Sequence, residues 1–328
     1  MLFSWMSSGT HSLETVTLGF LVYNVIAFGL QPIIGYLCDT YRKIPVEIIG
    51  FPLMVAGLLF MPAAALSIAL IGLGNAFFHI AGGIDSLRNS GGKMARSGVF
   101  VSSGALGVVS GSLVGSAGVL PVLIPIGVLL LCLVLMCYIY LERLKSEDAA
   151  VVFSLTKPDL KIGVIILLAA VSIMIRSYAG SIIPTEWRTS TLLFIFPAIG
   201  AFLGKFSGGF IADRVGAKRA AVFSLLAATV LLAFGNANPW IYLIGIILFN
   251  MSMAVTLCVI ASVLPLNPGL AFGITTLALL CGNVPTFFIP AVHANLIFAS
   301  LTVISAVCLY CLLKGRMKTD EKISEEIK

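Results

Sequence analysis

The stretch GGFIADRVGAKR, at Gly208–Arg219, decides the fold because it closes an apolar segment and has a weaker counterpart earlier in the chain. The counterpart is GYLCDTYRK, at Gly35–Lys43. Each copy places a glycine four residues before an aspartate and basic residues after it. Asp39 and Asp213 lie 174 residues apart. This spacing predicts a duplicated unit of about 170 residues, an organisation that many membrane transporters share.

The composition indicates an integral membrane protein. Hydrophobic residues make up 59% of the chain, charged residues only 10%, and the mean hydropathy is +1.09. Long continuous apolar runs satisfy their backbone groups in lipid as helices, so the predicted fold class is all-α. Segments of about 20 apolar residues cross a bilayer core. Eleven are predicted, at 15–37, 46–62, 65–86, 97–117, 121–141, 161–183, 190–211, 217–235, 240–263, 270–289 and 292–313.

The basic residues predict the orientation. If the spans alternate from an outside N-terminus, 17 of the 20 lysines and arginines fall on one side, which the positive-inside rule makes the cytoplasm. Only Arg188 is placed outside, while Arg176 and Lys205 fall within spans. The tryptophans, Trp5, Trp187 and Trp240, fall at the outer interface. We expect a prokaryotic inner membrane and a cytoplasmic C-terminus. The net charge of +6 therefore reflects topology and gives no indication of nucleic acid binding.

The two halves are unequal. A polar connector at 142–160 separates an N-terminal half at 1–141, with five spans, from a C-terminal half at 161–313, with six, and a charged tail occupies 314–328. The aspartate signature follows the second span of the C-terminal half but the first span of the N-terminal half. If the repeats match, a helix before residue 15 is missing, and we expect a truncated or misassigned start.

These residues resemble the major facilitator superfamily. The loop signature of that family, G-x-x-x-D-R-x-G-x-K-R, is matched by Gly209, Asp213, Arg214, Gly216, Lys218 and Arg219. The first copy matches at Gly35 and Asp39, has Thr40 in place of the arginine, and carries Arg42 and Lys43 nearby. The segments LQPIIGYLCD, GLGNAFFHIAGG and SGVFVSSGALG are similar to the fosmidomycin-resistance type of efflux protein. This resemblance implies a two-half helical bundle and proton-coupled efflux.

The signature predicts a conformational latch. Each aspartate can accept hydrogen bonds from a neighbouring helix N-terminus, where the helix dipole favours an anion. The basic residues after it can pair with acidic groups across the interface between the halves. A latch of this kind would hold one conformation and release in the other. The alternative is that the charges only anchor helix ends at the membrane surface.

Substrate or coupling groups are expected among polar residues inside the spans. Arg176 could bind an anionic substrate, or snorkel to the outer headgroups. Lys205 could serve the same site, or snorkel inward. His79 could carry a proton or make a helix-packing hydrogen bond. Weaker candidates for the cavity are Gln31, Asn250 and Asn283, of which the two asparagines could instead bond between helices.

All 14 acidic residues fall in loops, tails or span ends. In the resembled antiporters the proton-carrying acid often lies on the first helix. Coupling therefore runs either through His79 or through an acid on the missing helix, and we favour the second. Gly104, Gly107, Gly111 and Gly115 share one helix face and resemble the antiporter signature of the family without its proline. We expect them to pack against another helix.

The sequence gives no sign of an enzyme. It has no H-E-x-x-H and no G-x-S-x-G with a partner base, and its seven cysteines lack metal-ligand spacing. We expect no cofactor or metal, a proton gradient as the energy source, and a monomer in membrane lipid. The predicted function is transport of a small molecule, which Arg176 favours as an anion, by alternating access. Efflux by proton antiport is the leading form. Uptake by symport and a non-transporting relic or sensor are the alternatives.

Overall fold

The computed structural model describes residues 2–8, 11–41, 44–116, 122–143, 150–153, 155, 160–183, 191–289 and 292–314. Within these ranges the chain is helical and has no strand. The N-terminal half contains α1 (Leu2–Ser8), α2 (Leu13–Asn24), the π-helix η1 (Val25–Gly29), α3 (Gln31–Thr40), α4 (Val46–Leu59), α5 (Ala64–Arg88), α6 (Ala95–Ser116) and α7 (Leu123–Arg143). The C-terminal half contains α8 (Ile162–Ile182), α9 (Thr191–Val215), α10 (Ala217–Phe234), α11 (Pro239–Asn250), α12 (Ser252–Val263), α13 (Pro268–Asn283), the 3-10 helix η3 (Val284–Phe287) and α14 (Ala294–Leu312).

The predicted spans are confirmed as helices. Nine helical stretches of the described chain are long and apolar enough to cross a membrane, and the shorter apolar helices Ile48–Leu59 and Leu123–Tyr138 account for the other two predictions. Three spans are composite: α2, η1 and α3 form one, α11 and α12 form another, and α13 and η3 form the third. Proline at the first turn of α3, α11 and α13 is compatible with a new helix beginning there.

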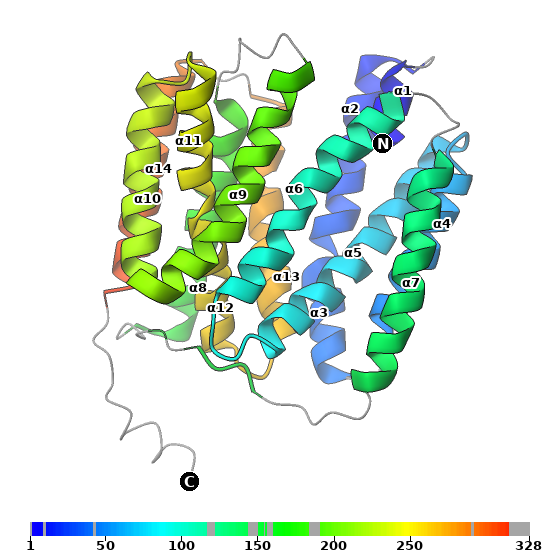
Figure 1. Cartoon of the computed structure of the whole chain (residues 1–328), viewed down its shortest axis with the longest axis horizontal. Coiled ribbons are helices and arrows are strands. Elements are labelled where there is room, and N and C mark those ends of the chain that lie inside the picture. The colour runs from blue at the N-terminus through cyan, green and yellow to red at the C-terminus, as the bar shows by residue number, and fades with distance from the viewer. Residues whose placement is uncertain are drawn as a thin grey trace.

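The two halves stand side by side and meet along two helix pairs, α3 with α13 and α6 with α9 (Figure 1). We call this interface the seam. One end of the bundle, the lower end in Figure 1, carries many of the described cations, and we call it the basic end. Its cations are Arg88, Lys93, Arg96, Lys161, Arg214, Lys218, Arg219 and Lys314.

Part of the polar connector packs beneath the bundle at this end. Val151 and Phe153 are buried, and the Val151 amide donates to the Pro265 carbonyl over 3.0 Å, in the turn between α12 and α13. The connector therefore joins the halves and also contacts the turn that leads into the seam-forming helix α13. The connector residues 144–149, 154 and 156–159, and the tail beyond Lys314, lie outside the described residues.

The helix α1 was not foreseen from the sequence. It packs against α2 and α6 at the end of the bundle opposite the basic end (Figure 1). Leu2 and Met6 are buried there, and the hydroxyls of Ser4 and Ser112 are 3.0 Å apart. A seven-residue helix gives too short an apolar pattern to be recognised in the sequence.

Glycines bring the seam helices close together at the basic end. A Cβ at Gly98 on α6 would lie 2.7 Å from the Lys205 carbonyl oxygen on α9, and one at Gly209 would lie 2.6 Å from the Met94 carbonyl oxygen. On the other pair, Gly35 lies directly against the backbone of Gly269. Side chains at these positions would push the halves apart.

Two alanine substitutions on α6 are expected to have opposite effects on stability. Gly98→Ala overpacks the seam and should cost about 1–3 kcal/mol. Gly104→Ala meets nothing within 4 Å, so it should stabilise by about 0.5–1 kcal/mol through helix propensity. Thermal unfolding of both variants in the same detergent measures the difference. Equal transition temperatures would show that α6 does not approach α9 at Gly98.

Candidate functional site

Asp213 on α9 binds the start of α6 in the other half. Its Oδ1 accepts a hydrogen bond from the Met94 amide over 2.8 Å, and its Oδ2 accepts one from the Ala95 amide over 3.0 Å. Both amides belong to the first turn of α6 or to the residue before it, where they have no partner within the helix. The helix dipole adds to the attraction of the carboxylate. We call these two bonds the Asp213 latch.

Asp39 makes the equivalent contact on the other side of the seam. Its Oδ1 accepts from the Gly269 amide over 3.0 Å and its Oδ2 from the Leu270 amide over 2.8 Å, at the start of α13. Asp39 is buried, whereas Asp213 is exposed. We call this pair of bonds the Asp39 latch. The two latches are pseudo-symmetric, since each half supplies one aspartate and one helix N-terminus, and the hydrogen bonds expected from the sequence are present in both.

The sequence predicts that the basic residues of each signature pair with acidic groups across the seam. This prediction is wrong for the described basic residues of the second signature. Arg214, Lys218 and Arg219 form no ion pair with a described carboxylate, because both latch aspartates already face helix amides. Lys218 instead places its Nζ 4.0 Å from the centre of the Tyr310 ring, within its own half. Gly216 has φ of +92°, which lets the chain turn sharply between α9 and α10. Arg42 and Lys43 lie outside the described residues.

His79 lies at the seam inside a group of four phenylalanine rings. The ring centres of Phe28, Phe78, Phe100 and Phe272 lie between 5.6 and 6.5 Å from that of His79. We call this group the aromatic cage. Its members come from η1, α5, α6 and α13, so both halves contribute to it. His79 makes no hydrogen bond with a described residue, which argues against the helix-packing alternative.

Lys205 approaches the same region from α9, where its carbonyl oxygen lies against Gly98 of α6, two residues before Phe100 of the cage. Lys205 is half-buried and has no hydrogen bond or ion pair with a described residue. Gln31, at the start of α3, is fully buried, and its Nε2 donates to the Ala27 carbonyl over 2.6 Å. Its Oε1 has no hydrogen-bond partner. The seam thus gathers an ammonium, an imidazole and an amide oxygen whose hydrogen-bonding capacity the described chain leaves unused.

Arg176 lies inside the C-terminal half. It is only 2% exposed, so its side chain does not reach the surface and does not snorkel to the lipid headgroups. Its guanidinium donates to the Ser172 carbonyl, to the Ser252 hydroxyl over 2.5 Å and to the Thr256 hydroxyl over 2.8 Å. All of these partners are on α8 and α12, and none is a carboxylate. The charge is therefore hydrogen-bonded but not neutralised by a described residue.

Arg176→Met is expected to leave stability unchanged or raise it. Burying an unneutralised guanidinium costs several kcal/mol, which neutral hydroxyl partners offset only in part. Ser252 and Thr256 would not be left unsatisfied, since Ser252 also donates to the Phe249 carbonyl of α11 and Thr256 to carbonyls of its own helix. Thermal unfolding in detergent checks this. A fall of more than a few degrees would show that the guanidinium bonds hold α8 and α12 together.

The two asparagine candidates differ. Asn250 donates to the Ile246 carbonyl of its own helix over 2.9 Å, just before the break at Met251, so it bonds within one helix and not between helices. Asn283 accepts from the Ser181 hydroxyl over 3.1 Å, which joins α13 to α8. The alternative prediction, a hydrogen bond between helices, is therefore fulfilled at Asn283 but not at Asn250.

The predicted helix-packing face of α6 is wrong at Gly104 and Gly107. A Cβ at either position would meet nothing within 4 Å, because no described helix covers this part of α6. Gly115 is buried and Gly111 is half-buried, towards the end that α1 covers. Close contact is instead made at Gly98, a described glycine of α6 that the sequence analysis did not select. Gly98 lies against Gly209 of the second signature. This contact could not be inferred from the sequence without knowing that α6 and α9 are neighbours.

Comparison with known proteins supports the fold. No protein-family model matches the sequence. Among solved structures, the E. coli fucose:proton symporter FucP is similar at 13% identity, with a TM-score of 0.63 over 94% of this chain and 95% of that chain. A bacterial homologue of the iron transporter ferroportin, in an outward-facing state, is similar at 16% identity, with a TM-score of 0.57 over 95% of this chain and 92% of that chain. The chain therefore has the all-helical membrane fold of major facilitator transporters.

Proposed function

We propose that the protein is a secondary active transporter that moves a small molecule across the membrane by alternating access. The observation that carries the proposal is the pair of latches. Each joins the halves at the basic end through hydrogen bonds that a relative rotation of the halves would break. Bonds of this kind can hold one state and release in another. Residues that only anchored helix ends would not need to cross the seam twice in the same way.

The proposed cargo site lies at the seam beside the aromatic cage. Lys205, His79 and the Gln31 Oε1 offer donors and an acceptor that no described residue uses, and buried polar groups of this kind are costly unless a partner completes them. Lys205 favours an anionic cargo, and the cage would hold its apolar part. Arg176 belongs to the same half as Lys205 but is enclosed between α8 and α12, so we assign it an electrostatic contribution only.

Proton-coupled efflux is the leading form of the proposal, on the strength of the resemblance to fosmidomycin-resistance proteins. Uptake by symport is the alternative, and the fold likeness to a fucose:proton symporter keeps it open. The engaged latches support an outward-facing state if the basic end is cytoplasmic. The inner-membrane location, the cytoplasmic C-terminus and the monomer stay predictions.

The function is tested by flux in proteoliposomes with an imposed pH gradient. Fosmidomycin, an anionic phosphonate, is the first probe, followed by radiolabelled small organic anions. Cargo movement in the direction opposite to the proton flow would support antiport, and movement in the same direction as the proton would support symport. Binding of a probe without flux, in vesicles that hold their gradient, would contradict the transporter proposal and favour a sensor.

A further inference from the structure

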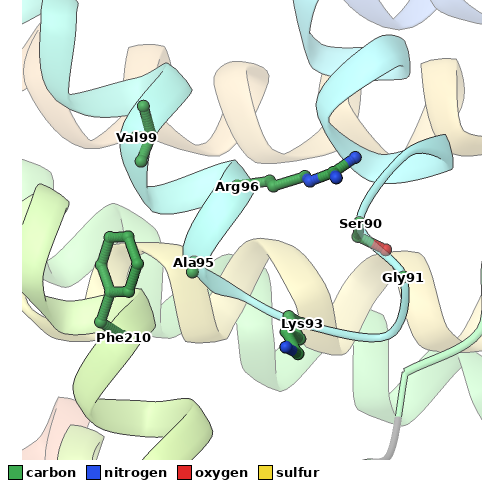
Figure 2. A pocket seen from close by; sticks show the side chains of 7 residues that line it. All are labelled: Ser90, Gly91, Lys93, Ala95, Arg96, Val99 and Phe210. Atoms are coloured by element: carbon green, nitrogen blue, oxygen red, sulfur yellow. The ribbon is translucent and has the colours of Figure 1, made fainter.

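A cavity of about 500 Å³ opens at the basic end beside the Asp213 latch. It is lined by the turn after α5, with Ser90, by the start of α6, with Lys93 and Arg96, and by Val99 and Phe210. Figure 2 shows Arg96 reaching from the start of α6 towards the turn that carries Ser90, with Val99 and Phe210 on the other side of Ala95. Because Phe210 is on α9 and the rest on or before α6, the cavity straddles the seam.

The polar side of the cavity is cationic. Lys93 and Arg96 are exposed, and neither forms an ion pair with a described carboxylate. Arg96 Nη1 donates to the Asn89 carbonyl, which holds the side chain across the turn and leaves its other N–H groups unused. The nearest carboxylate of the seam, Asp213, is already bonded to the Met94 and Ala95 amides. An anion entering here would therefore meet two cations, beside a carboxylate that already accepts two amide hydrogen bonds from α6.

The opposite side of the cavity is apolar and faces outward. Val99 is 42% exposed and Phe210 is 40% exposed, on neighbouring helices that both span the membrane. A cationic cleft at a membrane surface that borders an exposed apolar surface matches a phospholipid, with its phosphate in the cleft and its acyl chains along the apolar surface. A soluble anion would make no favourable contact with the apolar side of the cavity.

We propose that this cavity binds the headgroup of an anionic phospholipid, with its phosphate on Lys93 and Arg96 and an acyl chain along Val99 and Phe210. The site is complete only while α6 and α9 are together, so the bound lipid stabilises the state in which the Asp213 latch is closed. This inference does not depend on the cargo or on the direction of transport.

The test compares lipid retention by native mass spectrometry. Purified protein in a neutral detergent receives equal amounts of phosphatidylglycerol and phosphatidylcholine with the same acyl chains. The wild-type protein is expected to retain phosphatidylglycerol preferentially, and the double variant Lys93→Gln/Arg96→Gln to retain at least about tenfold less. The matched control is Lys161→Gln/Lys314→Gln, which also removes two exposed cations from the basic end but none from the cavity. It should retain phosphatidylglycerol as the wild type does.

Other outcomes overturn the proposal. Equal loss in the control variant would mean that general charge, and not the cavity, holds the lipid. Undiminished retention by the cavity variant would place the lipid elsewhere. Displacement of phosphatidylglycerol by millimolar inorganic phosphate would assign the site to a soluble anion. If the double variant does not fold, Lys93→Gln alone carries the test, because the Lys93 side chain is exposed and makes no hydrogen bond or ion pair with a described residue.

Discussion

Asp213→Asn is expected to slow flux in proteoliposomes by at least about tenfold. Hydrogen bonds to a charged group contribute about 1.5–3 kcal/mol each, and the carboxylate accepts two from α6. An asparagine has one acceptor oxygen, so one amide loses its partner and faces an NH₂ group. A loss of about 2–3 kcal/mol shifts the balance between the two states by about 30- to 150-fold, away from the latched state. The protein then spends most of the transport cycle in the state in which the latch is open.

The matched control is Arg214→Gln, at the next residue. Arg214 is exposed and has no described ion pair, so this variant should transport as the wild type does. Asp39→Asn should behave like Asp213→Asn, since the Asp39 latch has the same geometry. Wild-type flux in both aspartate variants, with normal thermal unfolding, would reduce the signature to an anchor of helix ends.

Lys205→Met is expected to reduce flux of an anionic cargo by at least about tenfold without unfolding the protein. Methionine keeps most of the length of the side chain and removes the charge, so packing between α6 and α9 changes little. An ammonium in a site of reduced dielectric constant contributes several kcal/mol to binding an anion. The expected signature is a large increase in the concentration of cargo needed for half-maximal flux.

Lys218→Met is the control for Lys205→Met. It removes a cation that lies over Tyr310 at the basic end. Lys218 is on α10, which contributes no residue to the cage. Its flux should stay close to that of the wild type. If Lys205→Met transported the anion normally, the cargo would not bind at the seam beside His79. If both variants lost flux equally, Lys205 would act through the net charge of the membrane surface.

The helices and the chemistry of the latches were accessible from the sequence because both depend on local pattern. Apolar runs of membrane length give the spans, and an aspartate at a span end can bond to the free amides of a helix N-terminus wherever one is close. The partner of each aspartate was not accessible. That Asp39 reaches α13 and Asp213 reaches α6 follows from how the two halves pack.

The candidate site shows the same division. His79, Lys205 and Gln31 stood out as polar residues inside apolar spans. The aromatic cage did not, because Phe28, Phe78, Phe100 and Phe272 come from four elements and look like ordinary membrane residues singly. The glycine periodicity of α6 also pointed to the wrong positions. Regular spacing shows which residues share a face, but only the arrangement of neighbouring helices shows which face is covered.

The most direct test of alternating access is a pair of spin-label distances between the halves, measured in lipid with the seven native cysteines replaced. One pair, at Asn89 and Arg219, reports on the basic end, and the other, at Leu113 and Ala237, reports on the opposite end. All four positions are exposed. Adding Asp39→Asn and Asp213→Asn is predicted to lengthen the distance at the basic end and to shorten the distance at the opposite end. Unchanged distances, or distances that lengthen together at both ends, would contradict a transporter that opens its two ends in turn.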